Sequence, residues 1–176
     1  LACLLVTFTA CSSSSEESKP AADAAVDSAP PKVGDVETWA EIDGSSEGIA
    51  FGTRDGAPVL YVAGAGKILR VKPDGSSEVH AELPGVVGIA VRSDGDVLAC
   101  GKAEGAAGSS DMPGAIFRVD KTGAKTQLIG PTATQSFKLT NFVAVAPDDS
   151  LVFSDSAANK LYRANADGTN VTLIDD

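Results

Sequence analysis

The sequence has few of the residues on which several common functions depend. Of its 176 residues only 5% are aromatic, and His80 is the one histidine. Positive charge is also scarce, because 14 Lys and Arg stand against 24 Asp and Glu, which gives a net charge of −10 at pH 7. Such a surface repels the phosphates of nucleic acids, so we expect no nucleic-acid partner.

Several motifs are absent as well. The chain has no CxxC pair, no glycine-rich phosphate loop and no apolar run of about 20 residues, the length that a membrane-spanning helix needs. Short acidic segments do occur, "KPDG" at 72–75, "DKTG" at 120–123 and "NADG" at 165–168. Because they lack the ligand rhythm of an EF-hand, we interpret them as hairpin turns in which Gly supplies a positive φ.

The N-terminal segment is typical of a secretion signal followed by a linker. Residues 1–11, "LACLLVTFTAC", are apolar and end in a motif that resembles a bacterial lipobox, so we expect Cys11 to be lipidated. Without Met or a basic leader, the chain is expected to be clipped at its start. Residues 12–34 are rich in Ser, Ala, Pro and acids and predict a disordered tether. The expected location is therefore a bacterial cell envelope, through a lipid anchor. The alternative is an ordinary signal and a disordered linker.

Cysteine usage predicts no internal disulfide. Cys3 and Cys11 fall in the signal segment, which leaves Cys100 of the three cysteines. In "DVLACG" at 96–101 this residue alternates with apolar strand residues. We therefore interpret Cys100 as a small buried hydrophobic side chain and not as a nucleophile.

The strongest signal is an internal repeat that begins near residue 36. Inner strands are expected at 47–51, 87–91 and 141–145, at spacings of 40 and 54 residues. Each inner strand is followed by a turn and by three further strands. The third strand of the unit is the most similar among the three copies: "KILRVKPDG" at 67–75, "AIFRVDKTG" at 115–123 and "KLYRANADG" at 160–168. Four short strands per unit predict the blades of an all-β propeller, since a sandwich does not explain three copies in register.

An outer strand without a blade of its own precedes the first repeat. "WAEI" at 39–42 aligns with "HAEL" at 80–83, in the outermost strand of the first blade. In a closed ring such a strand completes the last blade and removes exposed sheet edges. Residues 35–176 are thus predicted to form a partial β-propeller of three blades and one extra strand. We expect the sequence to be a fragment that lacks a comparable C-terminal part.

Equivalent positions of successive blades face one another across the central channel of a propeller. Here these positions are Glu47, Val87 and Asn141, each at the start of an apolar inner strand. A carboxylate and an amide oxygen around one axis are hard ligands that suit Ca²⁺ or another divalent cation. The alternative is that both side chains only cap strands or hydrogen-bond a neighbouring loop.

From Glu47 onward the sequence resembles the SMP-30/gluconolactonase/LRE family of six-bladed propellers. The likeness is carried by "SEGIAF" at 46–51, "GDVLACGKAE" at 95–104, "GAIFRVD" at 114–120 and "LTNFVAVAPDDSLVFSDSAANKLYRANADG" at 139–168. The resemblance implies that Glu47 and Asn141 bind the metal and that a catalytic Asp lies in a later blade, beyond Asp176. The sequence departs from the family at Val87, where a polar residue is common, and at Phe142, where Gly is usual.

His80, Ser154 and Asp155 are further candidates for chemistry. His80 lies on an expected outer strand away from the channel, so a Ser-His-Asp triad is not expected. Ser154 and Asp155 end the second strand of the third blade, where the family also has an Asp-Ser pair. A structural hydrogen-bonding role is favoured for both.

Two functions are left open. The first is a lipid-anchored hydrolase in which a cation held partly by Glu47 and Asn141 polarises a lactone or ester carbonyl. The second is a non-catalytic NHL-like propeller that binds a protein or glycan at the cell surface, which Val87 and Phe142 favour. We expect a monomer in either case.

Overall fold

Three antiparallel sheets of four strands each make up the described part of the chain. The computed structural model describes residues 38–104 and 113–175, within the compact unit Thr38–Asp176. Sheet A contains β1 (Gly48–Arg54), β2 (Ala57–Gly64), β3 (Lys67–Val71) and β4 (Ser77–Glu82). Sheet B contains β5 (Ile89–Val91), β6 (Val97–Lys102), β7 (Gly114–Val119) and β8 (Lys125–Ile129). Sheet C contains β9 (Thr140–Val145), β10 (Leu151–Asp155), β11 (Lys160–Ala164) and β12 (Thr172–Asp175).

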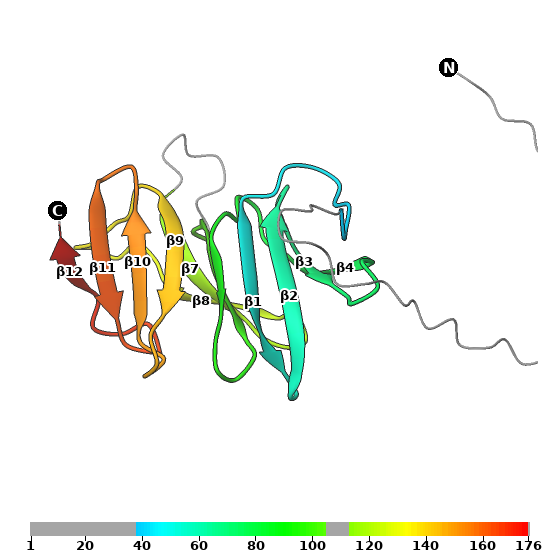
Figure 1. Cartoon of the computed structure of the whole chain (residues 1–176). Helices are drawn as coiled ribbons and strands as arrows, with labels where there is room; N and C mark the ends of the chain where they lie inside the picture. The colour runs from blue at the N-terminus through cyan, green and yellow to red at the C-terminus, as the bar shows by residue number, and fades with distance from the viewer. Residues whose placement is uncertain (1–37, 105–112, 176) are drawn as a thin grey trace, which may run out of the picture. The chain divides into compact units, whose positions relative to one another are not determined.

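In every sheet the strands lie in the order of the sequence, each paired with the next (Figure 1). This is the meander of a propeller blade, so the all-β propeller predicted from the repeat is confirmed. No long apolar helix that could cross a membrane is found among the described residues.

The acidic segments are hairpin turns, as their composition predicts. Gly75, Gly123 and Gly168 have φ values of 81°, 88° and 82°. The preceding carboxylates hold the turns, because Asp74 and Asp120 accept hydrogen bonds from the main-chain N–H two residues on, at 3.0 and 2.7 Å. Hydrogen bonds from the Ser76 and Thr122 hydroxyls, together with these main-chain bonds, lower the pKa of the Asp74 and Asp120 carboxyl groups. Their oxygens are therefore used within the turns.

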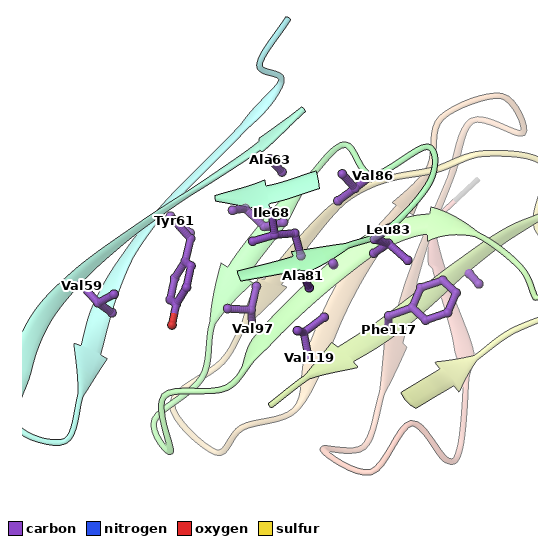
Figure 2. Packing of buried hydrophobic residues seen from close by; sticks show 14 of the residues in the cluster. Val59, Tyr61, Ala63, Ile68, Ala81, Leu83, Val86, Val97, Phe117 and Val119 are labelled. Atoms are coloured by element: carbon purple, nitrogen blue, oxygen red, sulfur yellow. The ribbon is translucent and has the colours of Figure 1, made fainter. Parts of the chain in front are cut away.

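Successive sheets pack face to face through two apolar clusters. The cluster between sheets A and B includes Tyr61 from β2, Val97 from β6 and Phe117 from β7, all at most 1% exposed (Figure 2). The cluster between sheets B and C is built around Leu98, Ile116 and the three rings of Phe137, Phe153 and Tyr162. Every middle strand is thus buried on at least one face, which explains its apolar sequence.

The inner strands approach one another too closely for side chains at two glycines. A Cβ atom at Gly48 would lie 2.2 Å from the carbonyl oxygen of Val87, and one at Gly88 would lie 2.1 Å from that of Asn141. The Gly88 N–H also donates a hydrogen bond of 2.9 Å to the Asn141 carbonyl. Main chain therefore meets main chain where sheet A contacts sheet B and where sheet B contacts sheet C.

Residues 38–42 contact sheet A. The outermost strand of sheet A contacts sheet B in the same way, and the outermost strand of sheet B contacts sheet C in the same way. A Cβ atom at Gly75 would come within 2.4 Å of the Trp39 carbonyl oxygen, and one at Gly123 within 2.1 Å of the His80 carbonyl oxygen. Ala40 and Ile42 pack on an apolar cluster of sheet A that contains Leu60, Val62 and Val71. The alignment of "WAEI" with "HAEL" is thus confirmed in space, although residues 38–42 form no ladder with the three sheets.

The buried Tyr61 and the half-buried His80 lie against each other at the edge of the first cluster. The rings of Tyr61 and His80 lie 5.0 Å apart, and neither the Tyr61 hydroxyl nor His80 Nε2 has a partner among the described residues. Burial lowers the pKa of His80, and the positive charges of Arg54 and Arg70 add to this, while the Asp120 carbonyl and carboxylate oppose it. The folded chain thus favours the neutral imidazole.

Gly88→Ala is expected to destabilise the chain by about 2–3 kcal/mol, because the added methyl group meets a main-chain carbonyl that cannot turn aside. The measurement is the free energy of unfolding in urea. Gly101→Ala is the matched control, since the nearest atoms to a Cβ atom there are side-chain atoms of Leu83 and Phe117 at 3.4 Å. Equal losses in both variants would contradict the close main-chain contact.

His80 is expected to make the stability of the chain depend on pH. The unfolded imidazole takes up a proton near pH 6.5 and the folded one only at lower pH, so the unfolded state binds more protons in this interval. The contribution of His80 to the free energy of unfolding is therefore present above pH 6.5 and is lost as the pH falls below this value. In urea unfolding from about pH 7.5 to about pH 5 the parent should lose more stability than His80→Gln. If the free energy of unfolding falls equally with pH in the parent and in His80→Gln, His80 does not cause the pH dependence.

Candidate functional site

The starts of the three inner strands bring Glu47, Val87 and Asn141 into one row. Glu47 and Val87 make equivalent main-chain hydrogen bonds to the adjacent strand of their own sheet. The Glu47 N–H donates to the Ala63 carbonyl at 2.9 Å, and the Val87 N–H donates to the Cys100 carbonyl at 3.1 Å. Val87 lies against the residue after Glu47, and Asn141 against the residue after Val87. Equivalent positions of adjacent sheets are thus neighbours in the main chain.

The side chains of this row differ in exposure and chemistry. Glu47 is exposed, whereas Val87 and Asn141 are half-buried. Within the described ranges Glu47 takes part in no salt bridge, so its carboxylate is free to bind a cation. The same ranges contain no group of three His, Cys, Asp or Glu side chains that could hold a metal ion. One carboxylate and one amide are therefore the oxygen donors that the row offers.

A β-bulge lies at Asn141 and Phe142. The pairing of β9 with β10 passes from Val143 opposite Phe153 to Thr140 opposite Asp155, so two residues of β9 face the single residue Ser154. The Phe142 N–H donates to the Ser154 hydroxyl oxygen at 3.1 Å. The ladder of β1 with β2 begins at Gly48 opposite Ala63, and the Glu47 N–H donates to the carbonyl of the same Ala63. Bulges redirect side chains and are frequent beside functional sites.

Asp155 holds the segment that leads into Asn141. Its carboxylate is 1% exposed and accepts hydrogen bonds from the main-chain N–H groups of Lys138 and Leu139, both at 2.8 Å. The structural role favoured for Asp155 and Ser154 is therefore the role that the described contacts show. Both residues act on the main chain around Asn141.

Thr140 is a supporting residue that the sequence does not reveal. It is 1% exposed, and its hydroxyl donates to the Ala115 carbonyl of β7 at 2.9 Å. This bond ties the start of β9 to the sheet before it. A threonine at the start of a strand is common, so no sequence signal distinguishes it.

The other candidates lie apart from the row. Cys100 is fully buried, and burial raises the pKa of its thiol to about 12, which agrees with an inert hydrophobic side chain. His80 lies on β4 against Tyr61. Cys11 and the linker at 12–34 lie outside the described residues, as does Asp176.

Two hollows of the surface lie at turns and not at the row. One of about 370 Å³ is lined by residues that include Arg54, Pro58 and Lys72. Another of about 350 Å³ is lined by residues that include Asp148 and Arg163. The β1–β2 and β9–β10 turns are at the opposite ends of the inner strands from Glu47 and Asn141. The row is thus not part of either hollow.

Comparison with known proteins identifies the fold through solved structures. No protein-family model and no curated protein sequence matches the chain. A gluconolactonase from Xanthomonas campestris superposes with a TM-score of 0.60 at 21% identity, over 74% of this chain and 47% of that protein. The chain therefore has a β-propeller fold, and its predicted resemblance to gluconolactonase-type propellers is confirmed in the fold.

Propellers with other activities match the chain as well. A catalytically inactive virginiamycin B lyase from Staphylococcus aureus with quinupristin gives a TM-score of 0.55 at 21% identity, covering 77% of this chain and 43% of that one. The PQQ-bound aldose sugar dehydrogenase of Streptomyces coelicolor gives a TM-score of 0.53 at 23% identity, covering 76% of this chain and 48% of that one. The chain spans less than half the length of these proteins, and they share its architecture across different chemistries.

Asp155→Ala is expected to cost about 2–3 kcal/mol of unfolding free energy, because two main-chain N–H groups lose a buried acceptor. Asp167→Ala is the matched control. The Asp167 carboxylate also accepts two hydrogen bonds, from the N–H and hydroxyl of Thr169, but it is exposed and water can replace it. We expect a much smaller loss for this control in urea unfolding. A similar loss in both variants would show that Asp155 does not hold the segment.

Proposed function

We propose that this propeller segment belongs to a metal-dependent hydrolase of the gluconolactonase type that acts on a lactone or an ester. The observation that carries the proposal is the row in which Glu47 and Asn141 flank the main chain of Val87. The likeness of the fold to a gluconolactonase supports it. The proposed substrate is therefore a small molecule that reaches the channel end of the inner strands.

Glu47 and Asn141 have the donor atoms that Ca²⁺ prefers. They would supply two of the six to eight oxygen ligands that this ion usually takes, and water or residues outside the described ranges would supply the rest. When bound, a divalent cation contributes polarisation of the substrate carbonyl. The bulge at Ser154 and the hydrogen bonds that Asp155 accepts from the preceding segment hold the main chain around Asn141, which supports this assignment.

The described residues act by binding and orienting. Val87, between Glu47 and Asn141 in the row, packs on the apolar cluster of sheets B and C and provides no oxygen donor. The general base that the resemblance implies would be an Asp of a later blade. We include in the proposal a lipid anchor at Cys11, a place in the bacterial cell envelope and a monomeric state.

A second candidate is a non-catalytic NHL-like propeller that binds a protein or glycan. The observation that favours it is the 64% exposure of the Phe142 side chain. Exposed aromatic residues frequently anchor protein interfaces. In that case Glu47 and Asn141 would have no common ion, and this difference separates the two candidates.

Calorimetric titration of the full-length protein with Ca²⁺ tests the ligand assignment. The parent should bind the ion, and both Glu47→Gln and Asn141→Ala should lose at least about tenfold in affinity, because each removes or weakens one oxygen donor. Glu82→Gln is the matched control, since Glu82 is an exposed carboxylate of β4 outside the row. If both site variants bind Ca²⁺ as the parent does, the assignment is wrong.

A further inference from the structure

The third strand of every sheet has an arginine at an equivalent position. In each sheet the partner of this arginine on the second strand pairs in turn with an alanine of the first strand. The three arginines are Arg70 in sheet A, Arg118 in sheet B and Arg163 in sheet C. Their surroundings can therefore be compared from sheet to sheet.

In sheets B and C this arginine is held by the turn between the first two strands. Arg118 donates a hydrogen bond of 2.5 Å to the Asp96 carboxylate. Arg163 donates to the Asp148 carboxylate at 3.3 Å and to the Ser150 hydroxyl at 3.2 Å. The turn of each of these sheets thus supplies oxygen acceptors, including a carboxylate that balances the positive charge.

The turn of sheet A lacks these acceptors. Val59 takes the place of Asp96 and Ser150, because each of the three lies two residues before the partner of the arginine. The first hairpin of sheet A is also longer, since its ladder continues beyond the last pair of the equivalent ladders, to Arg54 opposite Ala57. A second arginine is therefore present where the other sheets have acceptors.

The hollows beside these turns differ in charge for this reason. In sheet C the hollow of about 350 Å³ is lined by residues that include Arg163 and the acid Asp148. In sheet A the hollow of about 370 Å³ is lined by residues that include three cations, Arg54, Arg70 and Lys72. The same place in the repeat is thus balanced in sheet C and rich in positive charge in sheet A.

Glu78 of β4 balances only part of this charge. It forms salt bridges with Arg70 and, at 3.0 Å, with Lys72. One carboxylate is therefore shared by two cations, which leaves one positive charge of this pair uncompensated. The side chains of Arg70 and Lys72 are 30% and 43% exposed, so an ion from solution can reach them.

Arg54 has no close partner of its own. The nearby Asp55 carboxylate is bound by Lys121 at 2.6 Å and lies 3.8 Å from Arg54 Nε. The Arg54 side chain is only 23% exposed, yet within the described ranges its guanidinium group makes no hydrogen bond. A guanidinium group has five N–H donors. These donors are available to an acceptor from outside the chain.

A hollow with this lining favours a phosphate group among small anions. Guanidinium groups bind phosphate oxygens through paired, charge-assisted hydrogen bonds. A phosphate monoester carries a charge of about −1.5 to −2 near pH 7, which matches the charge of Arg54 together with the one left by Arg70 and Lys72. A carboxylate would neutralise only one of these charges.

We propose that the hollow lined by Arg54, Arg70 and Lys72 binds the phosphate group of a phosphate ester. It lies at the opposite end of the inner strands from Glu47 and Asn141, so the inference goes beyond the proposed function and does not depend on it. Both soluble esters and lipid headgroups carry such a group. Because the net charge of −10 opposes binding at an anionic membrane surface, we expect a soluble ester.

Calorimetric titration of the full-length protein with inorganic phosphate, in Ca²⁺-free buffer of low ionic strength, tests the site. Arg54→Gln removes the charge and Arg54→Lys keeps it, while Lys72→Asn inserts the residue that sheet C has at the equivalent position. Arg163→Gln is the matched control, because Arg163 lines the equivalent hollow of sheet C. Urea unfolding of each variant shows that it is folded.

The parent should bind phosphate more tightly than acetate. Arg54→Gln should weaken phosphate binding about tenfold, Lys72→Asn should weaken it less, and Arg54→Lys should lie between Arg54→Gln and the parent. Arg163→Gln should bind as the parent does. The site is refuted if the parent shows no saturable binding up to about 10 mM phosphate, if Arg54→Gln binds like the parent, or if Arg163→Gln loses as much as Arg54→Gln.

Sedimentation with phosphatidylcholine vesicles, with and without phosphatidic acid, distinguishes the two sources of phosphate. Phosphate binding without any sedimentation that requires phosphatidic acid identifies a soluble ester. Sedimentation that requires phosphatidic acid and is lost in Arg54→Gln identifies a lipid headgroup at the same site. Sedimentation that Arg54→Gln leaves unchanged, in a protein that does not bind inorganic phosphate, overturns the proposal.

Discussion

The contact of main chain with main chain at the starts of the inner strands is the constraint on which the rest of the structure depends. At Gly48 and Gly88 the carbonyl of the next sheet occupies the place of a side chain, and at Gly88 a hydrogen bond of 2.9 Å closes the contact. Because this contact allows no Cβ atom, it sets both the distance and the register between sheets. The same contact makes neighbours of positions that are 40 and 54 residues apart in the chain.

Core packing follows the same geometry outward from the inner strands. Where the inner strands converge, small residues recur, and Ala50, Ala90 and Ala144 pair with larger partners on the adjacent strands. Farther out, aromatic rings fill the wider space, as with the stacked Phe153 and Tyr162 at 5.4 Å. A taper from small to large side chains is what successive blades around one axis require.

Most of the fold could be predicted because its signals are local. Alternating apolar residues and Asp-Gly turns predict each strand, and the repeat predicts how the strands group into sheets. The bulge at Asn141 could not be predicted, since it depends on which residue of β10 lies opposite. The buried bonds of Thr140 and Asp155 likewise depend on where distant main-chain atoms arrive. For the site, the sequence predicts the row of positions but not the contacts that hold Asn141 in it.

The fold does not explain why Glu47 and Asn141 are polar. The bonds that these residues contribute to the sheets use main-chain atoms, the N–H of Glu47 to Ala63 and the carbonyl of Asn141 to Gly88. Val87 makes the equivalent main-chain bond to Cys100 with an apolar side chain, so the position itself needs no polar group. A strand cap would require the side chain to bond to the main chain, as Ser154 bonds to the Phe142 N–H. Among the described residues neither the carboxylate nor the amide is used by the sheets, and this is the condition that the proposed divalent cation requires of its oxygen donors.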